Sequence, residues 1–71
     1  MANTEEILRL INEKGLKKKH IASELGISTT ALWRKIRGLS EFDAREIVQM
    51  SEILGVKTAT ETNRLFLRKS S

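Results

Sequence analysis

The chain has 71 residues, enough for one domain with a single core, and its formal net charge is +4 at pH 7. It contains no cysteine and one histidine, which excludes disulfides, thiolate metal sites and histidine-rich metal sites. No apolar run is long enough to span a membrane, and residues 1–6 lack the apolar stretch of a signal peptide. We therefore expect a cytoplasmic protein with no cofactor, no metal and no membrane partner.

Four glycines punctuate the chain, and each follows a stretch with helical apolar spacing, as a C-cap glycine does. The first predicted helix covers about residues 4–14, where Asn3 and Glu6 can form a capping box. Its apolar stripe contains Ile7, Leu8, Leu10 and Ile11. The second predicted helix covers about residues 17–25, and its buried positions are Ile21, Ala22 and Leu25.

The third predicted helix begins after Ser28, a good N-cap residue, and reaches about residue 37. At about 100° per residue, Leu32 and Ile36 share one face, and the opposite face carries Thr30, Arg34 and Arg37. The fourth predicted helix has the clearest start signal of the chain and ends at Gly55. That signal is a capping box of Asp43 and Glu46 inside a hydrophobic staple of Phe42 and Ile47.

After residue 56 the pattern weakens, because residues 57–63 are polar and poor in helix-forming side chains. A short fifth helix from about Thr60 is the preferred prediction for this tail, and an extended segment is the alternative. Leu65, Phe66 and Leu67 either pack the tail on the core or form a contact between two copies of the chain. The predicted fold is thus an all-α bundle of four or five helices, with a core at about residues 4–56 and a tail at 57–71.

Positive charge is concentrated in one third of the chain. Residues 14–37 contain seven of the thirteen basic residues and one of the nine acidic residues, whereas residues 38–71 contain five of each. This uneven distribution is typical of a surface that binds the phosphates of a nucleic acid. Three successive lysines open the second predicted helix, where cations oppose the helix dipole unless an anion lies nearby.

Residues 15–38 predict two helices joined by a tight glycine turn. The small side chain of Ala22 allows the helices to approach closely, Gly26 suits a left-handed turn, and Ile27 fills the corner between the helices. The second helix of the pair is short enough to enter the DNA major groove, which is about 12 Å wide. Its exposed positions are Thr29, Thr30, Trp33, Arg34 and Arg37.

This stretch resembles the helix-turn-helix family of lambdoid phage repressors and Cro proteins. It looks most like small phage-associated regulators whose third helix ends in Arg-Lys-Ile-x-Gly before a Ser-Glu-Phe linker, here residues 34–38 and 40–42. The resemblance covers about residues 5–56, and the positions in register are Ala22, Gly26, Ile27, Leu32, Gly38 and Ile47. It implies that the chain is a single helix-turn-helix DNA-binding domain, built as a repressor-like bundle with the third helix in the major groove.

Carried over position by position, the resemblance implies that Thr29, Thr30 and Arg34 contact bases and that Lys18 contacts a phosphate. It implies further contacts to the DNA backbone at Arg37 and at Ser40. The sequence departs from the family pattern at Lys18, where glutamine is common. It also has Ile11 and Ile36 where many relatives have an Arg–Glu pair, and we expect an apolar contact there instead.

The residue types support these roles and extend them. Arg34 can make two hydrogen bonds to guanine, and Lys17, Lys19 and Ser28 can reach phosphates. Trp33 lies at the edge of the predicted core, so it either packs there or contacts thymine methyl groups and the DNA backbone. His20 has no partner suited to nucleophilic or metal chemistry and is expected to be a surface residue.

The predicted function is a sequence-specific, double-stranded-DNA-binding transcriptional regulator of Cro or repressor type, of phage or prophage origin. It is expected to act as a homodimer at least on DNA, at the nucleoid of a bacterial or phage-infected cell. The alternative is a protein-interaction module on the same fold, an anti-repressor or antitoxin, with non-specific DNA affinity and a protein partner at the C-terminal segment. An enzyme is not expected, because the sequence has no nucleophile–base arrangement and no phosphate-binding glycine loop.

Overall fold

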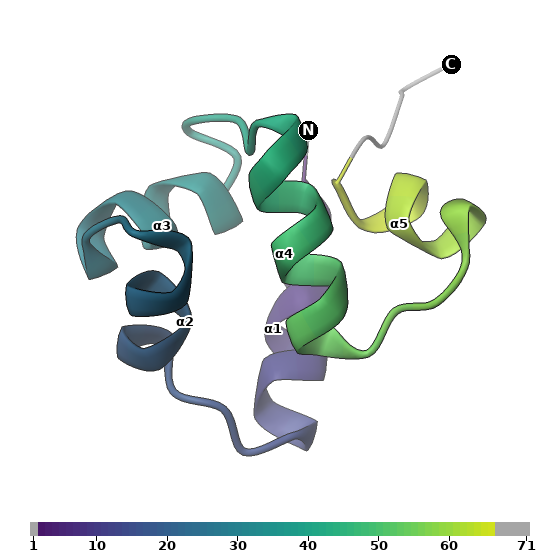
Figure 1. The fold of residues 1–71 in the computed structure, drawn as a ribbon, viewed down its shortest axis with the longest axis horizontal. Helices are drawn as coiled ribbons and strands as arrows, with labels where there is room; N and C mark the ends of the chain where they lie inside the picture. Colours follow the sequence, from purple (N-terminus) through teal and green to yellow (C-terminus); the bar gives the residue numbers. More distant parts are fainter. Residues whose placement is uncertain (1, 67–71) are drawn as a thin grey trace.

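The computed structural model describes residues 2–66, and this part of the chain is entirely helical, with no strand. The five helices are α1 (Thr4–Glu13), α2 (Lys18–Leu25), α3 (Thr29–Ile36), α4 (Ala44–Leu54) and α5 (Ala59–Phe66). None of them is long and apolar enough to cross a membrane. The predicted all-α bundle is therefore confirmed, with five helices rather than four. In Figure 1, α2 and α3 lie together on the left, α4 is central, and α5 lies on the right.

Nearly all of the core consists of aliphatic side chains from all five helices. The buried apolar residues of the core are Ile7, Ile11, Ile21, Ala22, Leu25, Leu32, Ile36, Phe42, Met50, Leu54, Leu65 and Phe66. Within it α2 packs against α3 and α4, while α1 packs against α3 and α5. Ile11 and Ile36 belong to this one cluster, as expected for an apolar pair in place of an ion pair. Helices α2 and α3, the two helices predicted to be joined by a glycine turn, thus pack on a single continuous core.

The start of α4 has the predicted geometry. The carboxylate of Asp43 accepts a hydrogen bond from the Glu46 N–H at 2.8 Å, and the Glu46 carboxylate accepts one from the Asp43 N–H at 2.9 Å. Phe42 is buried and Ile47 packs against the core, as the two residues of a hydrophobic staple do. The helix ends at Gly55, which has a left-handed φ of 73°.

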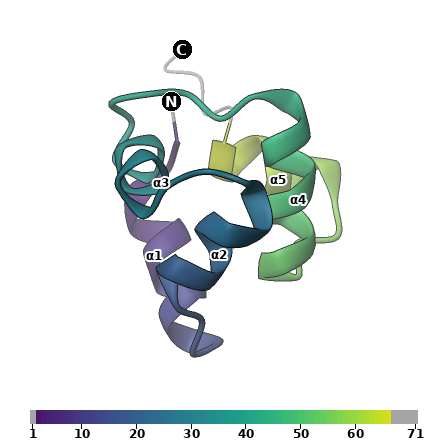
Figure 2. The ribbon, with the colours of Figure 1, turned by 60° about the vertical axis from the view of Figure 1, so that its left-hand side comes forward.

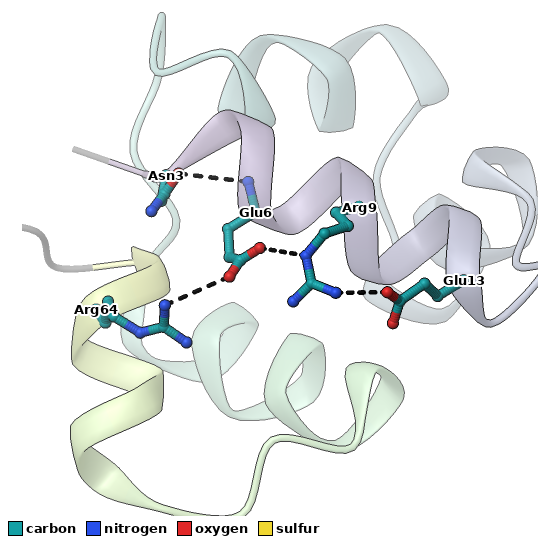
Figure 3. A network of polar contacts seen from close by, with 5 residues as sticks. All are labelled: Asn3, Glu6, Arg9, Glu13 and Arg64. Carbon is teal, nitrogen blue, oxygen red and sulfur yellow. Dashed lines mark hydrogen bonds and ion pairs between the residues drawn. The ribbon is translucent and has the colours of Figure 1, made fainter.

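The capping box predicted at the start of α1 is only half formed. The Asn3 side chain accepts a hydrogen bond from the Glu6 N–H at 3.3 Å. The Asn3 N–H, however, donates to the Leu65 carbonyl at 2.7 Å, so the start of the chain is joined to α5. The Glu6 carboxylate instead accepts hydrogen bonds from Arg9 and Arg64, and Arg9 also binds Glu13 (Figure 3). The hydrogen bond from Arg9, assisted by the charges of both arginines, holds the pKa of Glu6 below its usual value.

The described part of the tail, residues 57–66, contains helix α5, which packs on the core. Thr58 caps α5, because its hydroxyl accepts a hydrogen bond from the Glu61 N–H at 3.1 Å and donates to the Glu61 carboxylate. Phe66 packs edge-on against Phe42, with ring centroids 5.3 Å apart. Leu65 is fully buried and Phe66 is 4% exposed. The extended alternative is therefore wrong, and Leu65 and Phe66 pack on the core, the first of the two alternatives given for them. Leu67 lies outside the described residues.

Candidate nucleic-acid interface

Helices α2 and α3 are joined by a three-residue turn, and the local geometry of this unit follows the prediction (Figure 2). Gly26 has a φ of 72°, and a Cβ built on it would meet no atom within 4 Å, so the backbone conformation alone calls for glycine. The Ile27 N–H returns to the Ala22 carbonyl at 3.0 Å. Ala22 is 2% exposed and Ile27 packs against the core, so both residues lie where the two helices meet.

Helix α3 has one buried face and one exposed face. Leu32 and Ile36 are fully buried, which fixes the rotation of the helix about its axis. Thr29, Thr30 and Arg34, three of the four base-contact candidates, are exposed, and the fourth, Trp33, is half-buried. Helix α3 is fixed at its far end too, because the Thr4 hydroxyl donates a 2.6 Å hydrogen bond to the Ile36 carbonyl.

The residues predicted to contact phosphates occur at both ends of α3 and at the start of α2. Ser28 is the N-cap of α3, and its exposed hydroxyl oxygen accepts a hydrogen bond from the Ala31 N–H at 3.0 Å. Its hydroxyl hydrogen can still be donated to an anion. Ser40 is half-buried in the turn after α3, where its N–H donates to the Arg34 carbonyl at 3.3 Å. Lys17 is the N-cap of α2 and makes no side-chain capping bond.

Trp33 is half-buried at the edge of α3, between two cations. The Lys18 ammonium lies 5.2 Å from the centroid of the indole, and the Arg37 guanidinium lies 5.7 Å from it. Both distances fall within the range of cation–π attraction. The ring therefore brings a residue of α2 and the C-cap of α3 to one place. Sequence reasoning missed this arrangement, although the four-residue spacing of Trp33 and Arg37 could have indicated half of it.

An open groove runs beside this ring, and we call it the Trp33 groove. Its lining residues are Lys18, Thr29, Thr30 and Trp33. It combines the first residue of α2 with the first turns of α3, so it lies on the surface predicted to face DNA. None of its lining residues is acidic, and Lys18 is the charged one.

The cations of this surface have no acidic partner in the part of the chain that the structure describes. Among residues 2–66, no ion pair involves any of the five basic residues predicted to contact DNA, which are Lys17, Lys18, Lys19, Arg34 and Arg37. Lys35 differs from them, since it donates to the Glu46 carboxylate at 2.6 Å and is only 18% exposed. This ion pair joins α3 to the capping box of α4, and no local sequence pattern predicts it.

Within the described residues, the interface is thus a surface of exposed hydroxyl groups and of cations without acidic partners around one short helix, an arrangement suited to binding an anion. In the described part of the chain, no three histidine, cysteine, aspartate or glutamate side chains gather as metal ligands would. Comparison of the chain with protein-family models, with curated proteins and with solved structures finds no match, so the interface is interpreted from its own geometry and charge.

Proposed function

We propose that the chain is a sequence-specific DNA-binding transcriptional regulator of Cro or repressor type, in which α2, the turn and α3 act as a helix-turn-helix. The observation that carries the proposal is the set of five cations around α3 that have no acidic partner within the described residues. Cations left unpaired on one surface favour a polyanion, because each can neutralise a phosphate and release a counterion. The exposed polar face between them is the part that would meet base edges.

The dimensions of α3 suit the major groove of duplex DNA. Its eight residues correspond to a length of about 12 Å, comparable with the width of the groove. In this orientation Arg34 would donate two hydrogen bonds to a guanine, and Thr29 and Thr30 would contact neighbouring base edges. Lys17, Lys18, Lys19, Ser28, Arg37 and Ser40 would hold the flanking phosphates.

Two copies are expected to bind together on one face of the duplex, with recognition helices about 34 Å apart. Because Leu65 and Phe66 are buried in the core, the contact between the two copies would use other side chains than these two. Such a regulator would act at the nucleoid, in the cytoplasm of a bacterial or phage-infected cell. The alternative, a module that binds a protein partner, predicted a wide apolar patch at residues 65–67, and the burial of its first two members removes that support.

The proposal is tested by selecting binding sequences from a random duplex library with the full chain. We expect a palindromic or tandem motif with half-sites about 10 base pairs apart. The motif should be bound at least about 10³-fold more tightly than unrelated DNA. A salt titration on the selected duplex should give a steep loss of affinity, because several phosphate contacts release counterions. Enrichment of no motif, with weak binding to all sequences, would overturn the proposal and point to a protein partner.

A further inference from the structure

We infer that the Trp33 groove binds the C5 methyl group of a pyrimidine base in the major groove, thymine or 5-methylcytosine. The inference rests on the proposed function, because it names the chemical group that the same surface reads. It assigns a specificity role to Trp33, a side chain that general phosphate binding does not require.

The groove combines apolar and cationic groups. It is lined by Trp33 and by Thr29 and Thr30, whose side chains each carry a methyl group, and Lys18 brings a positive charge. The indole forms no hydrogen bond with any residue between 2 and 66. Trp33 stays half-exposed beside the two threonines, so an apolar group that enters the groove can displace water from the ring.

The positive charge around the groove favours an apolar group that arrives together with negative charge. A protein side chain would have to approach through unpaired cations, whereas a base in a duplex arrives with phosphates on both sides. Lys18 and Arg37 flank the ring and are free to meet those phosphates. Within the major groove the C5 methyl group of thymine is the one apolar group that an ordinary base pair presents, and 5-methylcytosine carries the same group.

The ring lies where two helices meet. Lys18 of α2 and Arg37 at the end of α3 both lie near the indole, and the half-buried Trp33 belongs to α3, which packs on α2. A ring that is partly packed in this way loses little conformational freedom when a ligand binds. The groove is thus ready to receive a methyl group when α3 enters the major groove.

The test uses the full chain and the duplex obtained by selection. Each thymine in turn is replaced by deoxyuridine, which lacks only the methyl group, and dissociation constants are measured by fluorescence anisotropy. We expect one thymine in each half-site at which deoxyuridine weakens binding about fourfold, the ratio that corresponds to roughly 0.8 kcal/mol for one buried methyl or methylene group. In a second series, cytosine and 5-methylcytosine are compared at that position. If 5-methylcytosine is bound more tightly than cytosine, the groove accepts the methyl group of either base. If the two are bound equally, the groove binds the methyl group of thymine only.

Two variants connect the methyl effect to the groove. Trp33→Ala should bind thymine and deoxyuridine equally at the identified position, and Thr30→Ser, which removes one methyl group, should reduce the ratio. Arg45→Ala, on the exposed face of α4, is the matched control and should keep the full ratio. Thermal unfolding of each variant identifies any loss of fold.

The failures of the two proposals are distinguishable. If no duplex is preferred, the proposed function fails. If a duplex is preferred but deoxyuridine replaces every thymine without loss for the unmodified chain, the methyl-binding inference alone is overturned. A methyl effect that persists in a folded Trp33→Ala variant would also overturn it, because another side chain would then read the methyl group.

Discussion

Arg34 is the single residue on which base recognition depends most in the proposed function. It lies on the exposed face of α3, opposite the buried Leu32 and Ile36, and it makes no ion pair with the described residues. A guanidinium group in this position can donate two parallel hydrogen bonds to guanine, whereas a phosphate contact would use the same charge without reading sequence.

Replacing Arg34 by alanine should therefore relax base preference at one position of each half-site. The lost discrimination should be roughly 1–3 kcal/mol, the usual contribution of a two-hydrogen-bond contact with guanine. Repeating the library selection with Arg34→Ala measures this directly, and Arg45→Ala serves as a control for loss of one positive charge. An unchanged motif with uniformly weaker binding would move Arg34 to the phosphate contacts.

Replacing Lys18 should weaken DNA binding without changing base preference, unlike replacing Arg34, because a phosphate contact carries no sequence information. Lys18→Met removes the ammonium group but keeps an apolar side chain beside Trp33. Affinity should fall for all duplexes alike, and the slope of log K against log salt should decrease by about one. Lys57→Met, in the connection between α4 and α5, removes the same charge far along the chain and should leave the slope unchanged. A loss confined to certain sequences would contradict the phosphate role of Lys18.

At the residue scale, the sequence predicts which side chains of α3 are exposed, but it does not predict which of them form ion pairs or ring contacts. The period of the helix places Arg34 opposite Leu32 and Ile36 without knowledge of any other element. Lys35 forms an ion pair and Arg34, among the described residues, does not, because Glu46 lies next to Lys35 alone. Glu46 is eleven positions after Lys35 and is brought to it only by the tertiary fold. The contact of Lys18 with Trp33 likewise joins two helices.

At the scale of the element, α3 is fixed to α4 by a nearly buried ion pair. Glu46 is 4% exposed, and its carboxylate oxygen accepts hydrogen bonds from both Lys35 and the N–H of Asp43. One carboxylate therefore completes the cap of α4 and holds the proposed recognition helix in place. This double use explains why an acidic residue is buried so close to a basic surface.

Glu46→Ala should destabilise the protein by about 2–3 kcal/mol. The variant loses one of the two hydrogen bonds of the capping box and the partner of Lys35. Lys35 is 18% exposed and can reach water, which keeps the loss below that of a fully buried pair. Urea unfolding measures the change, and Glu52→Ala on the exposed face of α4 is the control. A loss below about 0.5 kcal/mol, within the range of an ordinary surface substitution, would show that Glu46 does not join the two helices.

Helix start signals separate what could be predicted at this scale from what could not. The box of Asp43 and Glu46 precedes a clear apolar stripe, so α4 was predicted with its cap. Thr58 and Glu61 form a similar signal for α5, but polar residues follow it, so no apolar stripe marks the start of a helix there. The choice between helix and extended tail is made by burial of Leu65 and Phe66 against distant parts of the chain, which no local pattern contains.

At the scale of the whole molecule, the two ends of the described chain are joined by hydrogen bonds. The Asn3 N–H binds the Leu65 carbonyl, and Glu6 of α1 binds Arg64 of α5 at 3.3 Å. Helix α5 is therefore part of the same folded unit as the helices of the proposed interface. The core thus extends beyond the predicted bounds of about residues 4–56, because it includes Leu65 and Phe66 of the tail.

The contacts of Glu6 should make stability depend on pH in the acid range. Arginine contacts hold the pKa of Glu6 in the folded protein below the value of 4.5 expected in the unfolded chain. Because the folded state favours the ionised form, the contribution to stability is fully present well above pH 4.5. It is lost as the pH falls through the folded pKa, since protonation then ends the attraction in the folded protein. Stability should therefore show no dependence on this group between pH 6 and pH 8.

Glu6→Gln tests this link between α1 and α5. The variant should unfold at a lower urea concentration than the unmodified chain at pH 7, and the difference should shrink as the pH falls below 4.5. Glu5→Gln is the matched control, because it removes the same charge from the same helix turn, and Glu5 makes no ion pair with the described residues. If the two variants change stability equally at every pH, the effect comes from the helix dipole of α1 and not from a bond to α5.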